Sequence, residues 1–145
     1  MVALRRAGAA DLPALNALMH ASSAYDGAYR AMLDGYAVTE AQVARDHVVL
    51  AEEGGAVLGF YSLIVEGEPE LDLMFVSDAA QGRGLGERLF EDMRATARRL
   101  GSPSVKIVSH PPAEGFYRRM GAQVVGATEP AGAVTWARPI LRLPL

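Results

Sequence analysis

Cysteine is absent from the 145-residue chain, and histidine occurs only three times. Without cysteine the protein can form no disulfide, no thiolate zinc site and no cysteine nucleophile, and three scattered histidines do not make a set of metal ligands. The chain also lacks a dense run of lysine or arginine, and its formal net charge is -3. We therefore expect no metal site and no binding to nucleic acid or to an anionic membrane.

Long apolar runs are missing as well. No segment reaches the roughly 18 to 20 apolar residues that a membrane span requires, and the N-terminus lacks the basic-then-apolar order of a signal peptide. Lysine occurs once, beside thirteen arginines and abundant alanine, which suggests a GC-rich genome. We expect a cytoplasmic, bacterial protein. Half of the residues are apolar, which is enough for one core, so we expect residues 1–145 to form a single domain.

The N-terminal half combines helices with a run of consecutive strands. The glycine pair Gly54-Gly55 separates two β-rich segments and suits the two-residue turn of a hairpin. Three strands in direct succession then predict an antiparallel meander. The expected elements are a strand at 2–6, a helix that Asp11 caps, a weak helix within 22–35, a helix from Thr39 to about Asp46 with a capping signal, and strands at 47–53, 56–65 and 70–76.

The C-terminal half alternates helices and strands. Its expected elements are a helix at 84–100, a strand at 104–109, a helix at 112–120, and strands at 122–125 and 133–143. A strand, helix, strand crossover places two parallel strands in an otherwise antiparallel sheet. The predicted fold class is therefore mixed α/β, with a central sheet of six to seven strands flanked by helices.

The most informative segment leaves the strand at 70–76 and enters the long helix. Its glycines, Gly82, Gly84 and Gly86, let successive backbone N–H groups approach one anion, and the helix N-terminus adds about half a positive charge. The segment therefore predicts a pyrophosphate site, although glycines before a helix also serve close packing. It is not a Walker loop, because no Gly-Lys-Ser/Thr follows.

Two motifs in order give the chain a resemblance to the GNAT superfamily of acyl-CoA-dependent N-acyltransferases. The Gln-x-x-Gly-x-Gly signature of that superfamily is matched by Gln81, Gly84 and Gly86. Its later Ala-x-x-Phe-Tyr-x-x-x-Gly segment is matched by Ala113, Phe116, Tyr117 and Gly121. The order of the expected elements resembles the superfamily over essentially the whole chain.

The resemblance implies acetyl-CoA as cosubstrate, with its pyrophosphate held by the backbone of the glycine segment and Arg83 reaching a phosphate oxygen. It also implies a fourth strand that is bulged and splayed from the fifth, where the backbones of Met74 and Val76 bond the acetyl carbonyl and the pantetheine. The asparagine common before the second helix is absent, and Ser109 is the candidate that replaces it. The other implied cofactor contacts are Phe75, Gln81, Gly82, Gly84, Leu85, Gly86 and Phe116.

Tyr117 is similar in position to the tyrosine that protonates the departing CoA thiolate in many GNAT enzymes, although a Phe-Tyr pair also suits core packing. The acceptor amine must be neutral, which for a pKa of about 10.4 costs roughly 4.6 kcal/mol at pH 7, so a base should face the acetyl group. Glu70 is the first choice, because its place resembles that of a glutamate base in the superfamily, and Asp72 is the second. A solvated, acidic strand end is the alternative. Strict alternation would put Glu70, Asp72, Met74 and Val76 on one face of the strand and Leu71, Leu73 and Phe75 on the other.

We expect direct transfer of an acetyl group from acetyl-CoA to a primary amine in a ternary complex, because the chain offers no covalent nucleophile. The acidic residues between Glu66 and Asp72 favour a small cationic amine. A protein N-terminus or lysine as acceptor stays open, as does a non-catalytic acyl-CoA-binding regulatory module. Three tyrosines, Tyr25, Tyr29 and Tyr36, either stack on the acceptor or pack beneath a loop. The leucines at 141, 143 and 145 suit either the edge of a homodimer or closure of the sheet.

Overall fold

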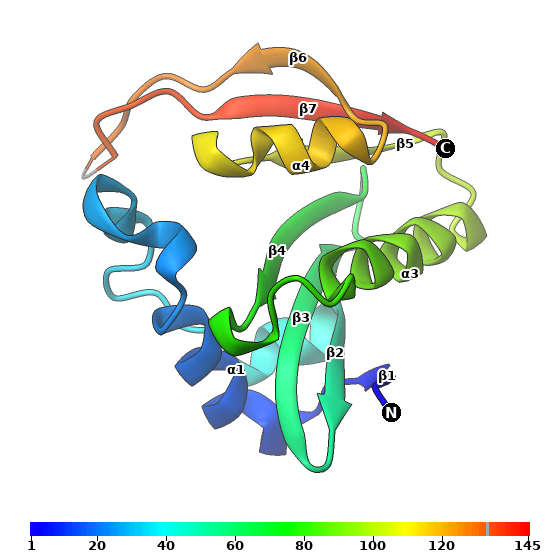
Figure 1. Ribbon diagram of the computed structural model, residues 1–145. Helices are drawn as coiled ribbons and strands as arrows, with labels where there is room; N and C mark the ends of the chain where they lie inside the picture. The colour runs from blue at the N-terminus through cyan, green and yellow to red at the C-terminus, as the bar shows by residue number, and fades with distance from the viewer. Residues whose placement is uncertain (133) are drawn as a thin grey trace.

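The computed structural model describes residues 1–132 and 134–145. Within these residues seven strands form one sheet, in the order β1-β2-β3-β4-β5-β7-β6, and every neighbouring pair is antiparallel except β4 and β5 (Figure 1). This confirms the mixed α/β class and the parallel central pair. The strands are β1 (Ala3–Arg6), β2 (His47–Glu53), β3 (Ala56–Ile64), β4 (Glu70–Val76), β5 (Ser104–Val108), β6 (Gln123–Ala127) and β7 (Pro139–Pro144).

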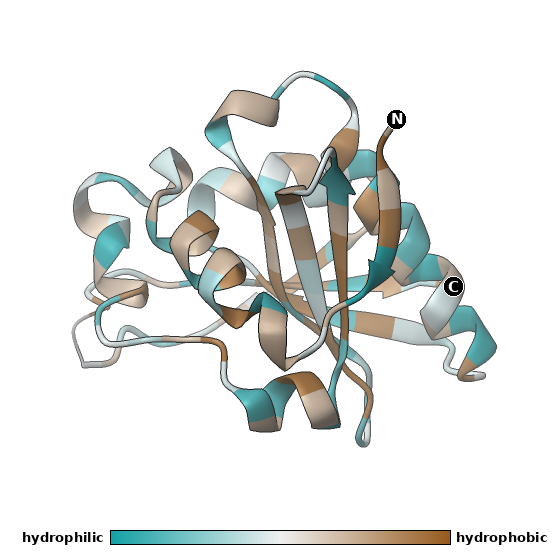
Figure 2. Ribbon diagram, turned by 90° about the horizontal axis from the view of Figure 1, so that it is seen from below, coloured by the Kyte–Doolittle hydropathy of each residue, from teal (hydrophilic) through white to brown (hydrophobic). Residues whose placement is uncertain are grey.

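Helices cover both faces of the sheet. The side chains of α3 and α4 pack into one hydrophobic core, and those of α1 and α2 pack into a second core on the opposite face. Figure 2 shows hydrophobic residues along the central strands between these layers. The helices are α1 (Leu12–His20), α2 (Glu40–Arg45), α3 (Leu85–Arg99) and α4 (Glu114–Arg119), and the 3-10 turns are η1 (Ala9–Asp11), η2 (Ser23–Tyr25), η3 (Gly27–Met32), η4 (Asp78–Ala80) and η5 (Pro111–Ala113).

The predicted caps of α1 and α2 have different outcomes. At α2 the prediction is confirmed, since the Thr39 hydroxyl accepts from the Gln42 N–H at 3.2 Å and the Gln42 side chain accepts from the Thr39 N–H at 2.8 Å. At α1 the position is confirmed, since Asp11 is the N-cap residue, but the expected side-chain cap is absent. The Asp11 carboxylate does not cap the helix, because it accepts from both Arg5 and the Gly8 N–H instead. The helix expected within 22–35 is present as two short 3-10 helices, η2 and η3, rather than as an α-helix.

A β-bulge in β4 confirms the bulged fourth strand that the resemblance implied and overturns the prediction of strict alternation. Ser62 pairs with Leu73 while the next residue of β3 pairs with Leu71, so Asp72 is an extra residue with no partner across the ladder. An extra residue reverses the faces of everything beyond it. Leu71 accordingly packs in the same core as Met74 and Val76, whereas Leu73 and Phe75 pack in the other.

The last strand is shorter than predicted and lies inside the sheet. It begins at Pro139 rather than at residue 133, and that residue lies outside the described ones. Because β7 is flanked by β5 and β6, it is not a sheet edge, and the side chains of Leu141 and Leu143 are buried in the core. These two leucines close the sheet, and the edge strand on this side is β6.

The sheet is joined at its centre by a short ladder. The parallel pairing of β4 with β5 consists of Glu70 with Lys106 and Leu71 with Ile107, and the strands diverge beyond it, as expected. The divergence leaves a gap between the C-terminal ends of β4 and β5. Among the described residues, no helix combines the length and the apolar character needed to cross a membrane.

Candidate active site

A cavity of about 500 Å³ lies between the end of β4, the first turn of α3 and helix α4. It gathers predicted site residues from three separate parts of the chain. Those that line it are Met74, Phe75, Val76, Gln81, Gly82, Gly84, Leu85, Gly86, Phe116 and Tyr117. The wall also includes Tyr25, His110 and Arg119.

The main chain of β4 turns hydrogen-bond donors toward this cavity. The Ser77 N–H donates to the Leu58 carbonyl on β3 at 2.8 Å. Because the N–H groups of successive strand residues point alternately to the two edges, those of Met74 and Val76 point away from β3. They face β5, which no longer pairs with β4 at that level. A backbone donor without a protein partner is a ready contact for a ligand carbonyl.

A glycine turn leads from β4 into α3. Gly82 has φ 80° and Gly84 has φ 73°, a left-handed conformation that glycine adopts without strain. Gly84 is the N-cap of α3 and no side chain caps the helix, so its first N–H groups are free to bind a ligand. The Gln81 side chain donates to the Val76 carbonyl at 3.0 Å and ties the turn to β4. The arrangement suits an anion such as a pyrophosphate.

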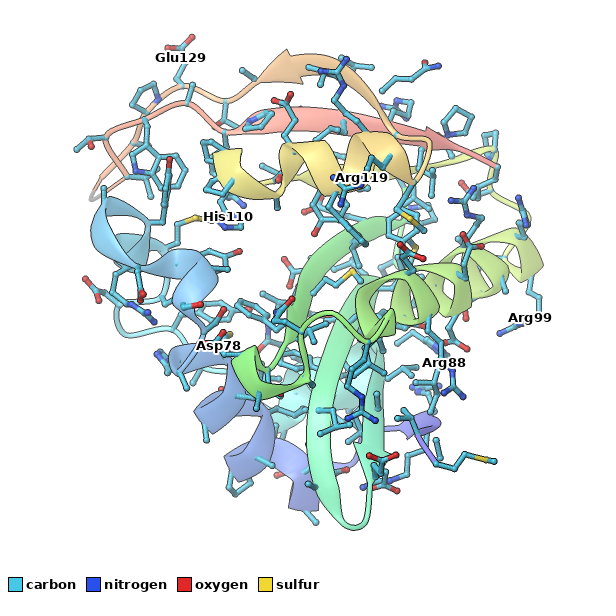
Figure 3. All side chains as sticks on the ribbon, viewed as in Figure 1. Asp78, Arg88, Arg99, His110, Arg119 and Glu129 are labelled. Carbon is cyan, nitrogen blue, oxygen red and sulfur yellow. The ribbon has the colours of Figure 1, made fainter. Side chains whose placement is uncertain are left out.

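Arg83, the predicted phosphate contact, forms an ion pair at the surface. Arg83 donates to Glu53 at the end of β2 at 3.0 Å, and this ion pair lowers the pKa of Glu53. Arg119 lines the cavity instead, with its guanidinium carbon 5.8 Å from the centroid of the Phe116 ring. Figure 3 shows Arg119 on α4 and His110 just before it. The three-residue spacing of Phe116 and Arg119 on a helix was the signal that could have indicated this.

Tyr117 lies where the first cavity meets a second one of about 160 Å³. Its side chain is buried, and burial raises the pKa of its hydroxyl. The hydroxyl therefore keeps its proton at neutral pH and can donate it to a leaving group.

Tyr25 and His110 stack on each other at the same boundary, with ring centroids 4.0 Å apart and planes 11° apart. The His110 Nε2 bonds the Ala24 carbonyl at 3.0 Å, so it carries the ring hydrogen. Burial lowers the pKa of His110 and raises that of Tyr25 to about 12, so both rings are neutral at pH 7. Tyr25 and His110 lie far apart along the chain, so no local sequence pattern could have predicted that their rings stack.

The second cavity contains one of the two candidate bases. Asp72 lines it, and burial, followed by the charges of Glu70 and Asp46, raises the pKa of Asp72. A raised pKa makes the carboxylate a better proton acceptor. Glu70 belongs to the wall of neither cavity, and among the described residues it pairs in the sheet ladder with Lys106.

The structure also bears on the predictions for Ser109 and for the acidic residues between Glu66 and Asp72. Ser109 lines the second cavity, but its hydroxyl already donates to the His110 carbonyl at 2.6 Å. Glu68 forms an ion pair with Arg142 beside a different hollow near the end of α3. The acidic residues between Glu66 and Asp72 therefore do not converge on one site, and Asp72 is the one that reaches the second cavity.

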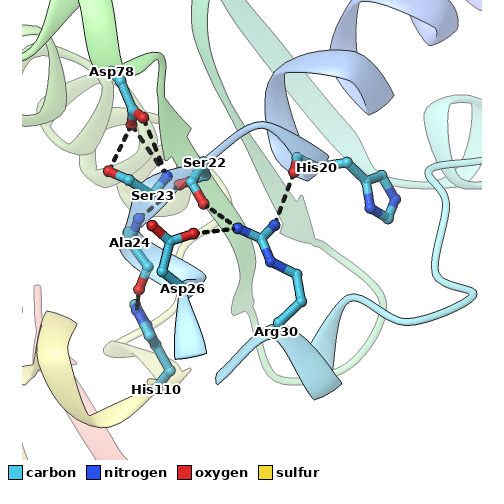
Figure 4. Close-up of polar contacts among 8 residues, drawn as sticks. All are labelled: His20, Ser22, Ser23, Ala24, Asp26, Arg30, Asp78 and His110. Carbon is cyan, nitrogen blue, oxygen red and sulfur yellow. Dashed lines mark hydrogen bonds and ion pairs between the residues drawn. The ribbon is translucent and has the colours of Figure 1, made fainter. Parts of the chain in front are cut away.

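The loop after α1 crosses the mouth of the gap and is anchored on both sides (Figure 4). We call Ser22–Tyr25 the crossing loop. On the β4 side, Asp78 accepts from the N–H of Ser23 at 3.2 Å and from its hydroxyl at 3.0 Å. On the β5 side, the Ala24 carbonyl accepts from His110. The crossing loop thereby holds the Tyr25 ring over the point where the two cavities meet.

Metal ligands are not grouped in the part of the chain that the structure describes. No three histidine, aspartate or glutamate side chains come together there in a way that could hold an ion.

Comparisons with known proteins agree with this fold. The model of the GNAT acetyltransferase domain matches residues 21–136. No curated protein matches significantly by sequence. Among solved structures, a GCN5-related N-acetyltransferase from Rhodopseudomonas palustris is similar, with 22% identity, a TM-score of 0.81, and coverage of 99% of this chain and 95% of that one.

Two further structures share the fold. YncA from Salmonella typhimurium, solved with its cofactor acetyl-CoA, is 20% identical with a TM-score of 0.76, covering 99% of this chain and 94% of that one. The ribosomal-protein-S18-alanine N-acetyltransferase from Escherichia coli is 18% identical with a TM-score of 0.76, at the same coverages of 99% and 94%.

Proposed function

Because the chain belongs to the GNAT acetyltransferase family, and is thus an acetyl-CoA-dependent N-acyltransferase, we propose that it transfers acetyl directly to a small primary amine in a ternary complex. The whole chain acts as one acetyltransferase domain in this proposal. One observation carries it: the N–H groups of Met74 and Val76 face the gap between β4 and β5, beside a cavity that the glycine turn closes.

The described residues suit acetyl-CoA along the length of the first cavity. The free N–H groups at the start of α3 and the glycine turn would hold the pyrophosphate, with Arg119 as the nearby cation. The β4 N–H groups would bind the pantetheine and the acetyl carbonyl in the gap. This places the reactive carbonyl close to Tyr117, where the second cavity begins.

The acceptor would enter from the second cavity and lose a proton to Asp72. The amine nitrogen then bonds to the acetyl carbon, while the β4 N–H groups stabilise the negative charge that develops on the carbonyl oxygen. The carbon–sulfur bond breaks as the amide forms. The Tyr117 hydroxyl gives its proton to the departing thiolate, the second proton of the amine nitrogen restores that hydroxyl, and Asp72 releases the first proton to solvent. No covalent enzyme intermediate is required, because both substrates occupy adjoining cavities.

The size of the second cavity favours a small amine. Its volume of about 160 Å³ lies below the range of roughly 300 to 1,000 Å³ that is typical of sites for drug-sized ligands. An ammonium ion is drawn to the Asp72 carboxylate, which supports a cationic acceptor. A protein N-terminus or lysine would need a more open approach, and a non-catalytic acyl-CoA-binding module would need neither Asp72 nor Tyr117.

The first test is thermal unfolding with and without acetyl-CoA. Ligand at about 100 times its dissociation constant adds roughly 2.7 kcal/mol of stability, which for a chain of this length raises the melting temperature by about 10 °C. Gly86→Glu places a negative charge in the cavity wall. Because the backbone of Gly86 is not left-handed, a side chain is tolerated there, and the rise in melting temperature with acetyl-CoA should fall below about 3 °C. Release of CoA in the presence of small amines then measures transfer.

Gly8→Glu is the matched control for the substitution. It makes the same chemical change at an exposed glycine with open space around its Cβ position, remote from the cavity. The control should keep the full rise. A wild-type protein that does not respond to acetyl-CoA would overturn the proposed function, and a response without CoA release from any amine would favour the non-catalytic module.

A further inference from the structure

The second cavity has a cation opposite its carboxylate, and we infer that the acceptor is a free amino acid whose ammonium faces Asp72 and whose carboxylate binds Arg138. This inference rests on the proposed function and narrows it. It concerns the cavity of about 160 Å³ that Asp72 and Arg138 both line. A simple cationic amine would leave one of these two charges without a counter-ion.

Arg138 has hydrogen-bond donors to spare. A guanidinium offers five N–H donors, and the Nη2 of Arg138 donates to the Val108 carbonyl at the end of β5 at 2.9 Å. Its Nε is buried and has no partner among the described residues. The ion pairs among the described residues are made by the N-terminal amine and by other arginines. A partly buried cation without an anion is costly, and a bound carboxylate would remove that cost.

The two charges stand on opposite walls of the gap. Asp72 is the bulged residue of β4, and Arg138 is held against the last residue of β5. Burial raises the pKa of Asp72, and the charge of Arg138 acts against it and lowers that pKa. Tyr117 lies on the same cavity. An ammonium drawn to Asp72 is thus near the site proposed for the acetyl group, and a carboxylate on the same molecule can reach the other wall.

The remaining wall points to an apolar side chain on the acceptor. Met32, Leu33, Leu71 and Leu73 contribute to it, together with the rings of Tyr25 and Tyr36. These residues offer no further charged group. The inferred substrate class is therefore a free amino acid with a small or medium apolar side chain.

The test compares each acceptor with two relatives that lack the carboxylate. Leucine, methionine and phenylalanine are each assayed beside the corresponding carboxamide and the corresponding decarboxylated amine, with acetyl-CoA saturating and CoA release as the readout. Losing a buried charge pair costs 2 to 5 kcal/mol, so kcat/KM should be at least about 30-fold higher for the amino acid. The carboxamide also imitates the first residue of a peptide, because it keeps the amine and the side chain.

Arg138→Gln should lower the preference for amino acid over carboxamide at least about 30-fold, mostly by raising the KM of the amino acid. The same variant should keep the rise in melting temperature with acetyl-CoA. Arg138→Lys keeps the charge and should retain part of the preference, which guards against a folding defect in the first variant. Arg142→Gln is the matched control, because this arginine lies on β7 and pairs with Glu68 away from the cavity.

The outcomes separate this inference from the proposed function. If the carboxamides or decarboxylated amines are acetylated as well as the amino acids, the inference is overturned and the proposed function stands. A faster reaction of the carboxamides would indicate a peptide N-terminus. If no acceptor with or without a carboxylate releases CoA, both are overturned.

Discussion

Asp72 and Glu70 lie two residues apart, yet the structure gives them different surroundings. Asp72 lines the second cavity with a raised pKa, whereas Glu70 lies outside it. A base with a raised pKa is protonated as the pH falls, so kcat/KM should drop on the acid side at a pH above the usual aspartate value. Asp72→Asn should lower kcat/KM by about 100-fold or more and remove this acid limb, as a pH–rate profile would reveal.

Glu70→Gln is the matched variant for that profile. It removes a negative charge that helps to raise the pKa of Asp72, so the acid limb should persist and move to lower pH. The reverse pattern, with the limb lost in Glu70→Gln and kept in Asp72→Asn, would restore the choice made from the sequence. That choice followed from the resemblance of Glu70 to a superfamily glutamate, and strict alternation gave Glu70 and Asp72 the same face. The bulge separates the two residues, and its position at Asp72 cannot be recognised from residue types such as Leu-Asp-Leu.

At the scale of elements, sequence signals worked where they were local. The capping residues of α2, the glycine hairpin and the amphipathic α3 were all predicted near their observed positions. The crossing loop was not predicted, because it is held by contacts from distant parts of the chain. Its anchors, Asp78 and His110, follow the crossing loop by more than fifty residues.

The anchoring of the crossing loop predicts an effect on acceptor binding. Asp78→Ala removes the acceptor of the Ser23 N–H and hydroxyl bonds. Losing this hydrogen bonding costs about 1 kcal/mol, which changes the equilibrium constant for opening of the crossing loop by about fivefold. Hydrogen exchange of the Ser23 amide should accelerate by that factor, and the KM of the acceptor should rise similarly. Asp34→Ala, an exposed aspartate before α2, is the control that should change neither. An unchanged Ser23 exchange rate in Asp78→Ala would contradict the anchoring role.

At the scale of the whole molecule, the order of the elements predicted the sheet and its parallel pair. The sequence motifs also located most of the residues around the first cavity, because glycine turns and helix starts are encoded locally. The second cavity could not be predicted. Arg138 and Asp72 come from opposite sides of the gap, and only the divergence of β4 from β5 brings them to one cavity.

The short central ladder predicts how ligand binding changes the exchange of backbone amides. The N–H groups of Met74 and Val76 face the gap and should exchange quickly in the free protein, whereas that of Phe75 points to β3 and should be protected throughout. At about 100 times its dissociation constant, acetyl-CoA should slow the first two by roughly 100-fold. Hydrogen exchange resolved by residue measures this, with Phe75 as the internal control. Slow exchange of Met74 and Val76 without ligand would contradict the assigned orientation.

The bulge in β4 also determines which single-codon deletions the gene can tolerate. Removing one residue from a regular strand exchanges core and solvent positions along the rest of it. Removing Asp72 would instead restore an unbroken ladder, with Leu71, Leu73 and Phe75 still directed to their present cores. The fold can therefore lose this codon more easily than its neighbours in the strand, and such a deletion would give a folded protein without the carboxylate of the second cavity.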